Sequence, residues 1–135
     1  MKFLILVAVF ISTLFSAEND WINDYEKALF QATQEKKQIY ILITSDSCGW
    51  CRKFENSTLQ NEAVLERLKQ SFVLVHVDRD RDTMPAMFKK ERVPRHYFVT
   101  HKGEIIHTFM GYWSSEDFNS LLDDVDKKII KGNTI

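Results

Sequence analysis

The chain has 135 residues, of which 44% are hydrophobic and 13% aromatic. This is enough for one compact domain with its own core, and too little for a second domain. The 18 Lys and Arg residues nearly balance the 19 Asp and Glu residues, which leaves a formal net charge of −1. Such a balance argues against a nucleic-acid partner, an anionic membrane surface or a strongly acidic substrate.

The first 17 residues have the pattern of an export signal. Lys2 precedes an apolar run over residues 3–15, and the small residues Ser16 and Ala17 follow it. The run is shorter than the roughly 20 apolar residues that a membrane-spanning helix needs. We therefore predict a signal peptide over residues 1–17, a single domain over residues 18–135, and a periplasmic or secreted location. Neither Ser16 nor Ala17 gives a clean small-x-small cleavage site, so a membrane tether through an uncleaved segment stays open.

The rest of the chain alternates between helical and strand patterns. Apolar residues spaced by three and four indicate helices, and short β-branched or aromatic runs indicate strands. In chain order, we predict helix 21–37, strand 39–44, helix 50–58, helix 61–70, strand 72–77, helix 83–90, strand 96–100, strand 104–109 and helix 114–131. Asp20 is the expected cap of the first helix. Strands joined through helices pair in parallel and a hairpin adds antiparallel strands, so the predicted fold class is α/β, with a mixed central sheet flanked by helices.

The chain has two cysteines, Cys48 and Cys51, separated by Gly49 and Trp50. Disulfides persist in an oxidising compartment, but a bridge across two residues closes too short a loop to stabilise a fold much. A structural zinc site needs four ligands, and the sequence has no second cysteine pair and no histidine pair of suitable spacing. The pair is therefore predicted to be redox-active, with no metal and no cofactor besides its own disulfide.

Cys48 lies between the end of a predicted strand and the start of a helix. Unpaired backbone N–H groups and the helix dipole at this place favour a thiolate, which lowers the pKa of a cysteine. Cys48 is thus the predicted attacking nucleophile, and Cys51, one turn further on, is the predicted resolving thiol. The uncharged Gly49-Trp50 pair favours a reductant over a strong oxidant.

A Val93–Pro94 pair directly before the strand predicted over residues 96–100 extends the pattern. With it the chain resembles thioredoxin-fold proteins, and most of all exported thiol:disulfide reductases such as the thioredoxin-like domain of DsbD-type membrane reductases. The resemblance is carried by residues 48–55, 61–68, 73–78, 93–94 and 109–112. In that superfamily the proline is cis and its neighbouring backbone pairs with the substrate chain. The resemblance implies a thioredoxin-like fold and a substrate site formed by Gly49, Trp50, Val93, Pro94 and Gly111.

Several positions depart from thioredoxin itself. Ser47 stands where thioredoxin has an aromatic residue, and Leu42 stands where it has a buried aspartate that helps to deprotonate the second cysteine. Glu55, one turn after Cys51, is the candidate substitute for this proton relay, and a solvated surface role is the alternative. Arg95, directly after the proline, is expected to place a bulky charge near the groove and so to imply different partners.

The favoured function is an exported dithiol reductase of protein disulfides. Its expected partners are protein thiols and disulfides, such as another periplasmic redox protein or a membrane thiol reductase, and it is expected to be a monomer. One alternative is an oxidase of the same fold, which a higher reduction potential would distinguish. Another is a chaperone-like binding module that uses the surface around Trp50, Val93 and Tyr112 while the cysteines are incidental.

Overall fold

A computed structural model of the chain describes residues 20–133, so the predicted signal peptide lies outside the described residues. The elements in chain order are β1 (Trp21–Ile22), α1 (Tyr25–Glu35), β2 (Gln38–Thr44), α2 (Gly49–Asn56), the short 3-10 helix η1 (Thr58–Gln60), α3 (Glu62–Ser71), β3 (Phe72–Asp78), β4 (Arg95–Val99), β5 (Ile105–Met110) and α4 (Ser115–Gly132). Among residues 20–133, no helix has the length and apolar character that crossing a membrane requires.

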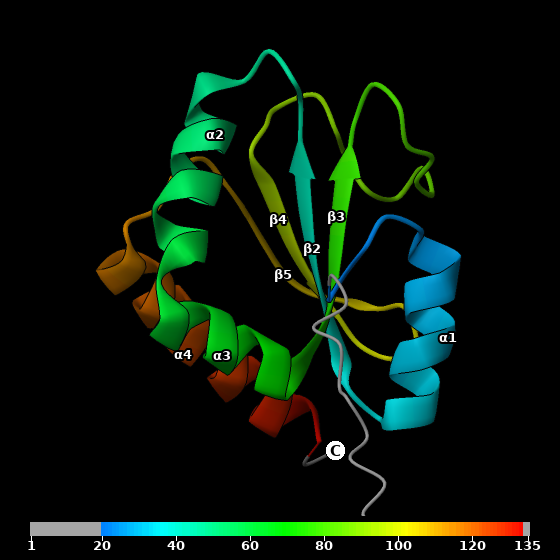
Figure 1. The fold of residues 1–135 in the computed structure, drawn as a ribbon. Coiled ribbons are helices and arrows are strands. Elements are labelled where there is room, and N and C mark those ends of the chain that lie inside the picture. Colours follow the sequence, from blue (N-terminus) through cyan, green and yellow to red (C-terminus); the bar gives the residue numbers. More distant parts are fainter. Residues whose placement is uncertain (1–19, 134–135) are drawn as a thin grey trace, which may run out of the picture.

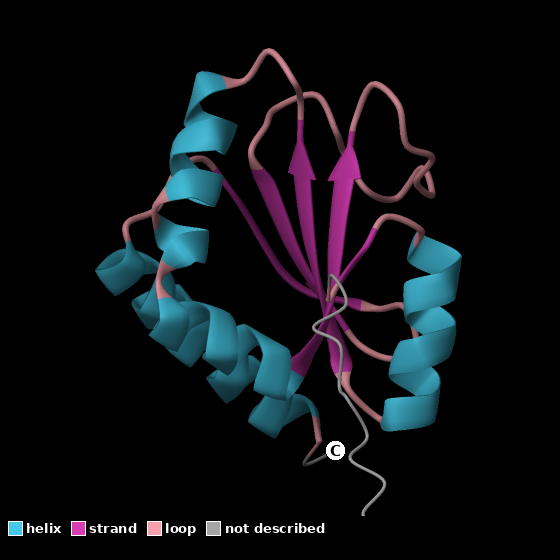
Figure 2. Cartoon of the chain, viewed as in Figure 1, coloured by secondary structure: helices cyan, strands magenta, loops and turns pink. Residues whose placement is uncertain are grey.

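A five-stranded sheet in the order β1-β3-β2-β4-β5 forms the centre of the domain. β1 and β2 run parallel to β3, whereas β4 runs antiparallel to both β2 and β5. Helix α1 covers one face of the sheet, and α2, α3 and α4 cover the other (Figures 1 and 2). The predicted α/β fold, with a mixed sheet flanked by helices, is confirmed.

Strand β2 lies in the middle of the sheet and is buried on both faces. Because side chains alternate along a strand, Ile39, Ile41 and Ile43 pack into the apolar cluster on the α1 face. Tyr40 and Leu42 pack into a second cluster on the opposite face, beneath α2 and α4. The continuous apolar run of β2 thus fills two cores at once, which fixes the strand that leads to the cysteines.

The first helix starts later than predicted. Trp21 and Ile22 form a short strand that pairs in parallel with Leu74 and Val75 of β3. Asp24, rather than Asp20, caps α1 by accepting a hydrogen bond from the backbone of Lys27 at 3.1 Å. Pairing with β3 therefore overrides the helical spacing of the apolar residues at this end, and the predicted start and cap were wrong.

The segment over residues 83–90 forms turns and not the predicted helix. Pro85 has no N–H group and disfavours the helical conformation of the residue before it. Met84 and Phe88 are nevertheless buried in the cluster on the α1 face, while Met87 is 47% exposed. The apolar spacing of residues 83–90 thus predicted which side chains are buried, but the helix that it predicted was wrong.

Arg67 of α3 links this helix to α4. Its Nη1 donates to the backbone oxygen of Asn119 at 3.1 Å, and its Nη2 donates to carboxylate oxygens of Asp123 at 2.6 Å and Asp126 at 2.8 Å. One side chain of α3 therefore contacts three residues of α4.

Candidate active site

The cysteine pair lies where β2 gives way to α2. The Cys48 backbone N–H donates to the oxygen of Ser45 at 3.1 Å, which turns the chain out of the strand. Cys48 then caps α2, because its Sγ accepts a hydrogen bond from the backbone N–H of Cys51 at 3.1 Å. The predicted position of Cys48 at a helix start is confirmed.

The two cysteines are joined by a disulfide, with their Cα atoms 5.3 Å apart. Cys51 is 1% exposed, whereas Cys48 is half-buried. After reduction, the N–H groups at the start of α2 would stabilise a thiolate on Cys48. Cys48 is therefore the more exposed of the two cysteines, and Cys51 is buried.

An apolar groove of about 340 Å³ is lined by Trp50, which stands between the two cysteines in the sequence, and by Val93, Pro94, Gly111 and Tyr112. The Val93–Pro94 peptide bond is cis. The Gly111 N–H donates to the oxygen of Pro94 at 2.8 Å, and Gly111 adopts φ +95°, a conformation that favours glycine. The structure thus brings four of the five predicted substrate-site residues together, while the fifth, Gly49, begins α2 and does not line this groove.

An aromatic rim borders the groove. Trp50 is 60% exposed, and its ring lies 5.9 Å from the ring of Tyr112, measured between centroids. The Lys53 ammonium lies 5.1 Å from the Trp50 centroid and 4.6 Å from the Tyr112 centroid. A cation held over two ring faces attracts both rings, so Lys53 braces the exposed tryptophan.

Arg95 does not line the groove, so the expectation that it would place a charge there was wrong. Its Nε donates to Thr108 Oγ1 at 3.0 Å, and its guanidinium lies 5.2 Å from the centroid of the Tyr97 ring. Tyr97 belongs to the cluster on the α1 face. Alternation along β4 directs Arg95 to that face, away from α2.

A larger polar cleft, of about 640 Å³, lies along the other side of α2. It is lined by Trp21, Asn23, Thr44, Ser45, Asp46, Arg52, Glu55, His76, Asp78, Arg81 and Asp82. Burial alone would raise the pKa of Asp78, but hydrogen bonds from the backbone of Asp80 and the charge of Arg81 hold it below its usual value. Within this cleft Arg81 therefore pairs with both Asp46 and Asp78.

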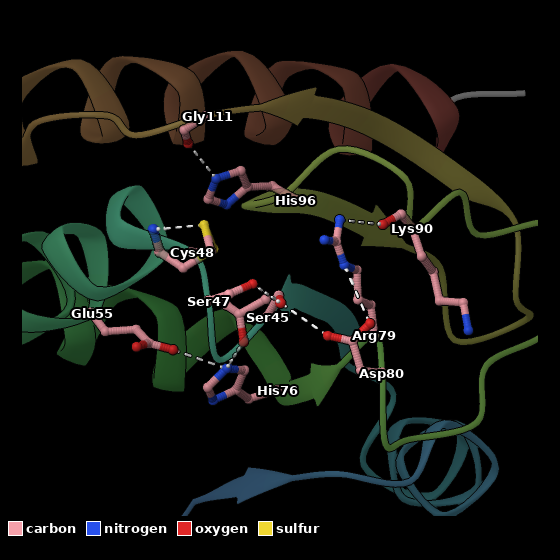
Figure 3. Close-up of a disulfide and its surroundings, with 12 residues drawn as sticks. Ser45, Ser47, Cys48, Glu55, His76, Arg79, Asp80, Lys90, His96 and Gly111 are labelled. Atoms are coloured by element: carbon pink, nitrogen blue, oxygen red, sulfur yellow. Dashed lines mark hydrogen bonds and ion pairs between the residues drawn. A yellow bond between two sulfur atoms is a disulfide. The ribbon is translucent and has the colours of Figure 1, made fainter.

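Glu55 contacts a histidine that sequence reasoning did not select. His76 Nε2 lies 3.0 Å from Glu55 Oε1 and 2.8 Å from Thr44 Oγ1 (Figure 3). His76 is the direct neighbour of buried Leu42 in the pairing of β2 with β3. A polar pair from α2 and β3 therefore stands beside the position where thioredoxin carries its aspartate. Only the strand register could have revealed His76.

A second histidine, His96, is fully buried beneath the groove. Burial lowers its pKa to about 4, a hydrogen bond to Gly111 opposes that shift, and the charge of Arg95 adds to it. His96 is therefore neutral near pH 7. Among residues 20–133, no group of three or more His, Cys, Asp or Glu side chains is placed to hold a metal ion.

A helix that starts at a cysteine pair, faces a cis-proline and packs on a mixed five-stranded sheet defines a thioredoxin-like domain with a C-x-x-C disulfide. A family model described as thioredoxin-like matches residues 20–100. This match covers more than half of the chain, and the chain belongs to that family.

Three curated proteins illustrate the range of similar sequences. Human spermatogenesis-associated protein 20 is 34% identical over 61 residues, which are 45% of this chain and 8% of that protein. An uncharacterized protein of Archaeoglobus fulgidus is 26% identical over 82 residues, or 61% of this chain and 64% of that protein. Mouse anterior gradient protein 3 is 24% identical over 119 residues, or 81% and 70%. The chain thus spans less than two thirds of the first two proteins.

Solved structures share the fold at low identity. DsbH oxidoreductase matches with a TM-score of 0.65 and 22% identity, over 79% of this chain and 83% of that one. A thioredoxin from Thermus thermophilus matches with a TM-score of 0.64 and 21% identity, over 83% and 88%. The oxidised C-terminal domain of Neisseria meningitidis DsbD matches with a TM-score of 0.63 and 16% identity, over 77% and 97%. At these identities the likeness establishes the fold alone.

Proposed function

We propose that this chain is an exported thiol:disulfide oxidoreductase that reduces disulfides in other proteins. The observation that carries the proposal is the half-buried Cys48 at the start of α2, bonded to buried Cys51 and set beside an apolar groove. A structural disulfide has no need of an accessible sulfur or of a groove next to it. Pairs with this geometry exchange electrons with a partner through a mixed disulfide.

The reaction moves two electrons from the cysteine pair to the substrate. The Cys48 thiolate attacks one sulfur of a substrate disulfide, forms a new S–S bond with it, and releases the other sulfur as a thiolate that takes up a proton. Cys51 then loses its proton and attacks Cys48 Sγ. This forms the Cys48–Cys51 disulfide and releases the second substrate thiolate, which is also protonated. The oxidised pair is the state that the structure holds.

Glu55 is proposed to accept the proton of Cys51. The two residues are four positions apart on α2, so they lie on the same side of the helix, and Leu42 offers no polar group there. The contact with His76 orients the Glu55 carboxylate and gives the proton an onward route into the polar cleft. A carboxylate on a helix face beside a second titratable group suits a general base.

The proposed setting is the periplasm or the outside of the cell, reached through residues 1–17. There a membrane thiol reductase or another periplasmic redox protein would return electrons to the pair. Protein disulfides are the proposed substrates because the groove is apolar and open, which suits a polypeptide segment.

The proposal is tested by assaying residues 18–135 for reduction of insulin by dithiothreitol. The wild-type domain should accelerate the reaction, and Cys48→Ser should return it to the rate without protein. Cys51→Ser should instead accumulate a mixed disulfide through Cys48, visible by mass spectrometry and lost on reduction. A wild-type domain without activity, or a Cys51→Ser variant that traps no substrate, would contradict the proposal.

The direction of electron flow is decided by the reduction potential, measured by equilibration with glutathione. We expect a value near the roughly −270 mV of thioredoxin, since the Gly49-Trp50 pair carries no charge. A value near −120 mV, about that of the strongly oxidising DsbA, would favour the oxidase.

The exposed Trp50 on the apolar groove favours a binding module as the second candidate function. A module of this kind would suppress aggregation of an unfolded client without using its thiols. The double variant with Cys48→Ser and Cys51→Ser separates the two functions, because a pure binding module keeps its full effect and a reductase loses its turnover.

A further inference from the structure

His96 makes two buried hydrogen bonds that join different parts of the fold. Its Nδ1 lies 2.7 Å from the Tyr40 hydroxyl of β2. Its Nε2 lies 2.9 Å from the backbone oxygen of Gly111 (Figure 3). The imidazole is enclosed by aromatic rings, with centroids 4.5 Å away in Phe109 and 4.9 Å away in Phe54. A polar ring in such a place is costly unless both nitrogens are paired.

The partners determine the protonation state of this ring. A carbonyl oxygen can only accept, so His96 Nε2 carries the proton that it donates to Gly111. In a neutral imidazole Nδ1 is then an acceptor, and the Tyr40 hydroxyl donates to it. Burial keeps the pKa of His96 near 4, so this neutral tautomer is the one present at neutral pH.

Gly111 is held through both of its backbone polar groups by the segment that follows the cis peptide bond. Its N–H donates to Pro94 at 2.8 Å, and its oxygen accepts from His96, two residues further along. Pro94 and Gly111 are both walls of the groove. The side chain of His96 lies beneath these walls and is not among the residues that line the groove.

We infer that His96 is a positioning residue that holds Gly111 against Pro94 and so sets the shape of the groove for a polypeptide substrate. The inference rests on the proposed function and deepens it, since it separates docking from sulfur chemistry. His96 contacts neither sulfur through any hydrogen bond in the described part of the chain, so its loss should weaken docking and leave the reactivity of the thiols intact.

A plain core role is the competing explanation, and the hydrogen bonds argue against it. Phenylalanine would fill the same aromatic enclosure without the cost of burying two ring nitrogens. What phenylalanine cannot supply is the donor to Gly111. His96→Phe therefore keeps the packing and removes the proposed role.

The experiment compares His96→Phe with Tyr40→Phe, which removes the other hydrogen bond of the same ring and leaves Gly111 paired. Each reduced protein is assayed against a protein disulfide, insulin, and against a small one, bis(2-hydroxyethyl) disulfide. We expect His96→Phe to raise KM for insulin about tenfold, with kcat within twofold and the rate with the small disulfide unchanged. Tyr40→Phe should stay within twofold of the wild type in every assay.

Three results would overturn the inference. They are an unchanged KM in His96→Phe, a parallel loss with both disulfides, or an equal loss in Tyr40→Phe. Failure of the wild-type protein to reduce either disulfide would instead remove the proposed function, so the two failures can be told apart.

Nuclear magnetic resonance of the wild-type protein tests the same point if a variant does not fold. The ¹⁵N shifts of His96 should report a neutral ring with its proton on Nε2, slow to exchange with solvent. A proton on Nδ1 would overturn the inference, because Gly111 would then lack its donor.

Discussion

The two sides of α2 differ in polarity: one borders an apolar groove and the other a polar cleft. The groove beside Cys48 is small and apolar, and its walls include the backbone at Pro94 and Gly111. The cleft on the other side is nearly twice as large, at about 640 Å³ against about 340 Å³, and is lined by polar and charged groups that include Glu55 and His76. Volume alone would therefore not identify the proposed substrate site. The smaller groove includes Trp50 of the C-x-x-C motif, and the larger cleft includes Glu55, the proposed proton acceptor.

The groove side should be the part of the molecule most sensitive to acid. The pKa of His96 is about 4 in the folded chain and about 6.5 in the unfolded chain, so between these values the unfolded state binds more protons. Stability that is present near pH 7 is therefore lost as the pH falls toward 4, by about 3 kcal/mol from this residue. Urea unfolding at pH 7, 5.5 and 4 should show the loss, and His96→Phe should flatten it.

His107 provides the control for this measurement. Its pKa is also lowered by burial, with Lys128 adding to the shift, but its side chain is only half-buried. His107→Gln should leave most of the acid sensitivity in place. An acid sensitivity that vanished in His107→Gln and persisted in His96→Phe would assign it to His107 and contradict the prediction.

The cleft side should affect the second chemical step and not docking. Glu55→Gln removes the proposed proton acceptor, so resolution of the mixed disulfide by Cys51 should slow about tenfold, while attack by Cys48 keeps its rate. Acid quenching of a single turnover, followed by mass spectrometry, measures both steps. Glu66→Gln on α3 removes an equal charge and should change neither step. Slowing of both steps in Glu55→Gln would contradict the proposal that the cleft side affects only the resolution step.

Gly111 tests how far the groove depends on backbone conformation. A Cβ at this position would meet no atom within 4 Å, so the cost of Gly111→Ala arises from the φ of +95°. We expect a loss of about 1 kcal/mol in the free energy of unfolding, together with a higher KM for a protein disulfide. Gly132→Ala, where a Cβ also meets nothing and φ is not positive, is the matched control and should not destabilise the protein.

Lys53 should give the smallest effect. Lys53→Gln removes the cation that braces Trp50 and Tyr112, an interaction worth about 0.5 to 1 kcal/mol at an exposed site. KM for a protein disulfide should rise less than about fivefold. With Trp21 and Trp113 both replaced by Phe, so that Trp50 is the single tryptophan, fluorescence anisotropy should show that Trp50 moves more freely in Lys53→Gln than in Lys27→Gln, which changes an exposed lysine elsewhere. Unchanged anisotropy would show that the tryptophan is braced by Tyr112 alone.

Much of the fold could be predicted because its strongest signals are local. The β-branched run that became β2 and the capped pattern that became α4 each carry a period that a sequence displays directly. The wrong predictions lie where residues distant in the sequence determine the local structure. Trp21 and Ile22 have helical spacing but pair with β3, and Pro85 breaks a segment whose apolar residues are still buried.

The candidate site shows the same division. The cysteines and Pro94 belong to motifs with fixed spacing, so the sequence could bring them to attention. His76 and His96 are single residues without a motif, and each gained its partners only when strands came into register. Arg95 was misplaced for a related reason, since the face to which it points depends on the phase of β4.

The hydrogen bonds and ion pairs of Arg67 couple the unfolding of α3 to that of α4. α3 and α4 are separated by about forty residues of chain, yet one guanidinium donates to Asn119, Asp123 and Asp126 together. In native-state hydrogen exchange their amide protons should therefore open as one cooperative unit, while the amides of the loop over residues 79–94 exchange earlier. The domain would then unfold in cooperative units whose segments are not contiguous in the sequence.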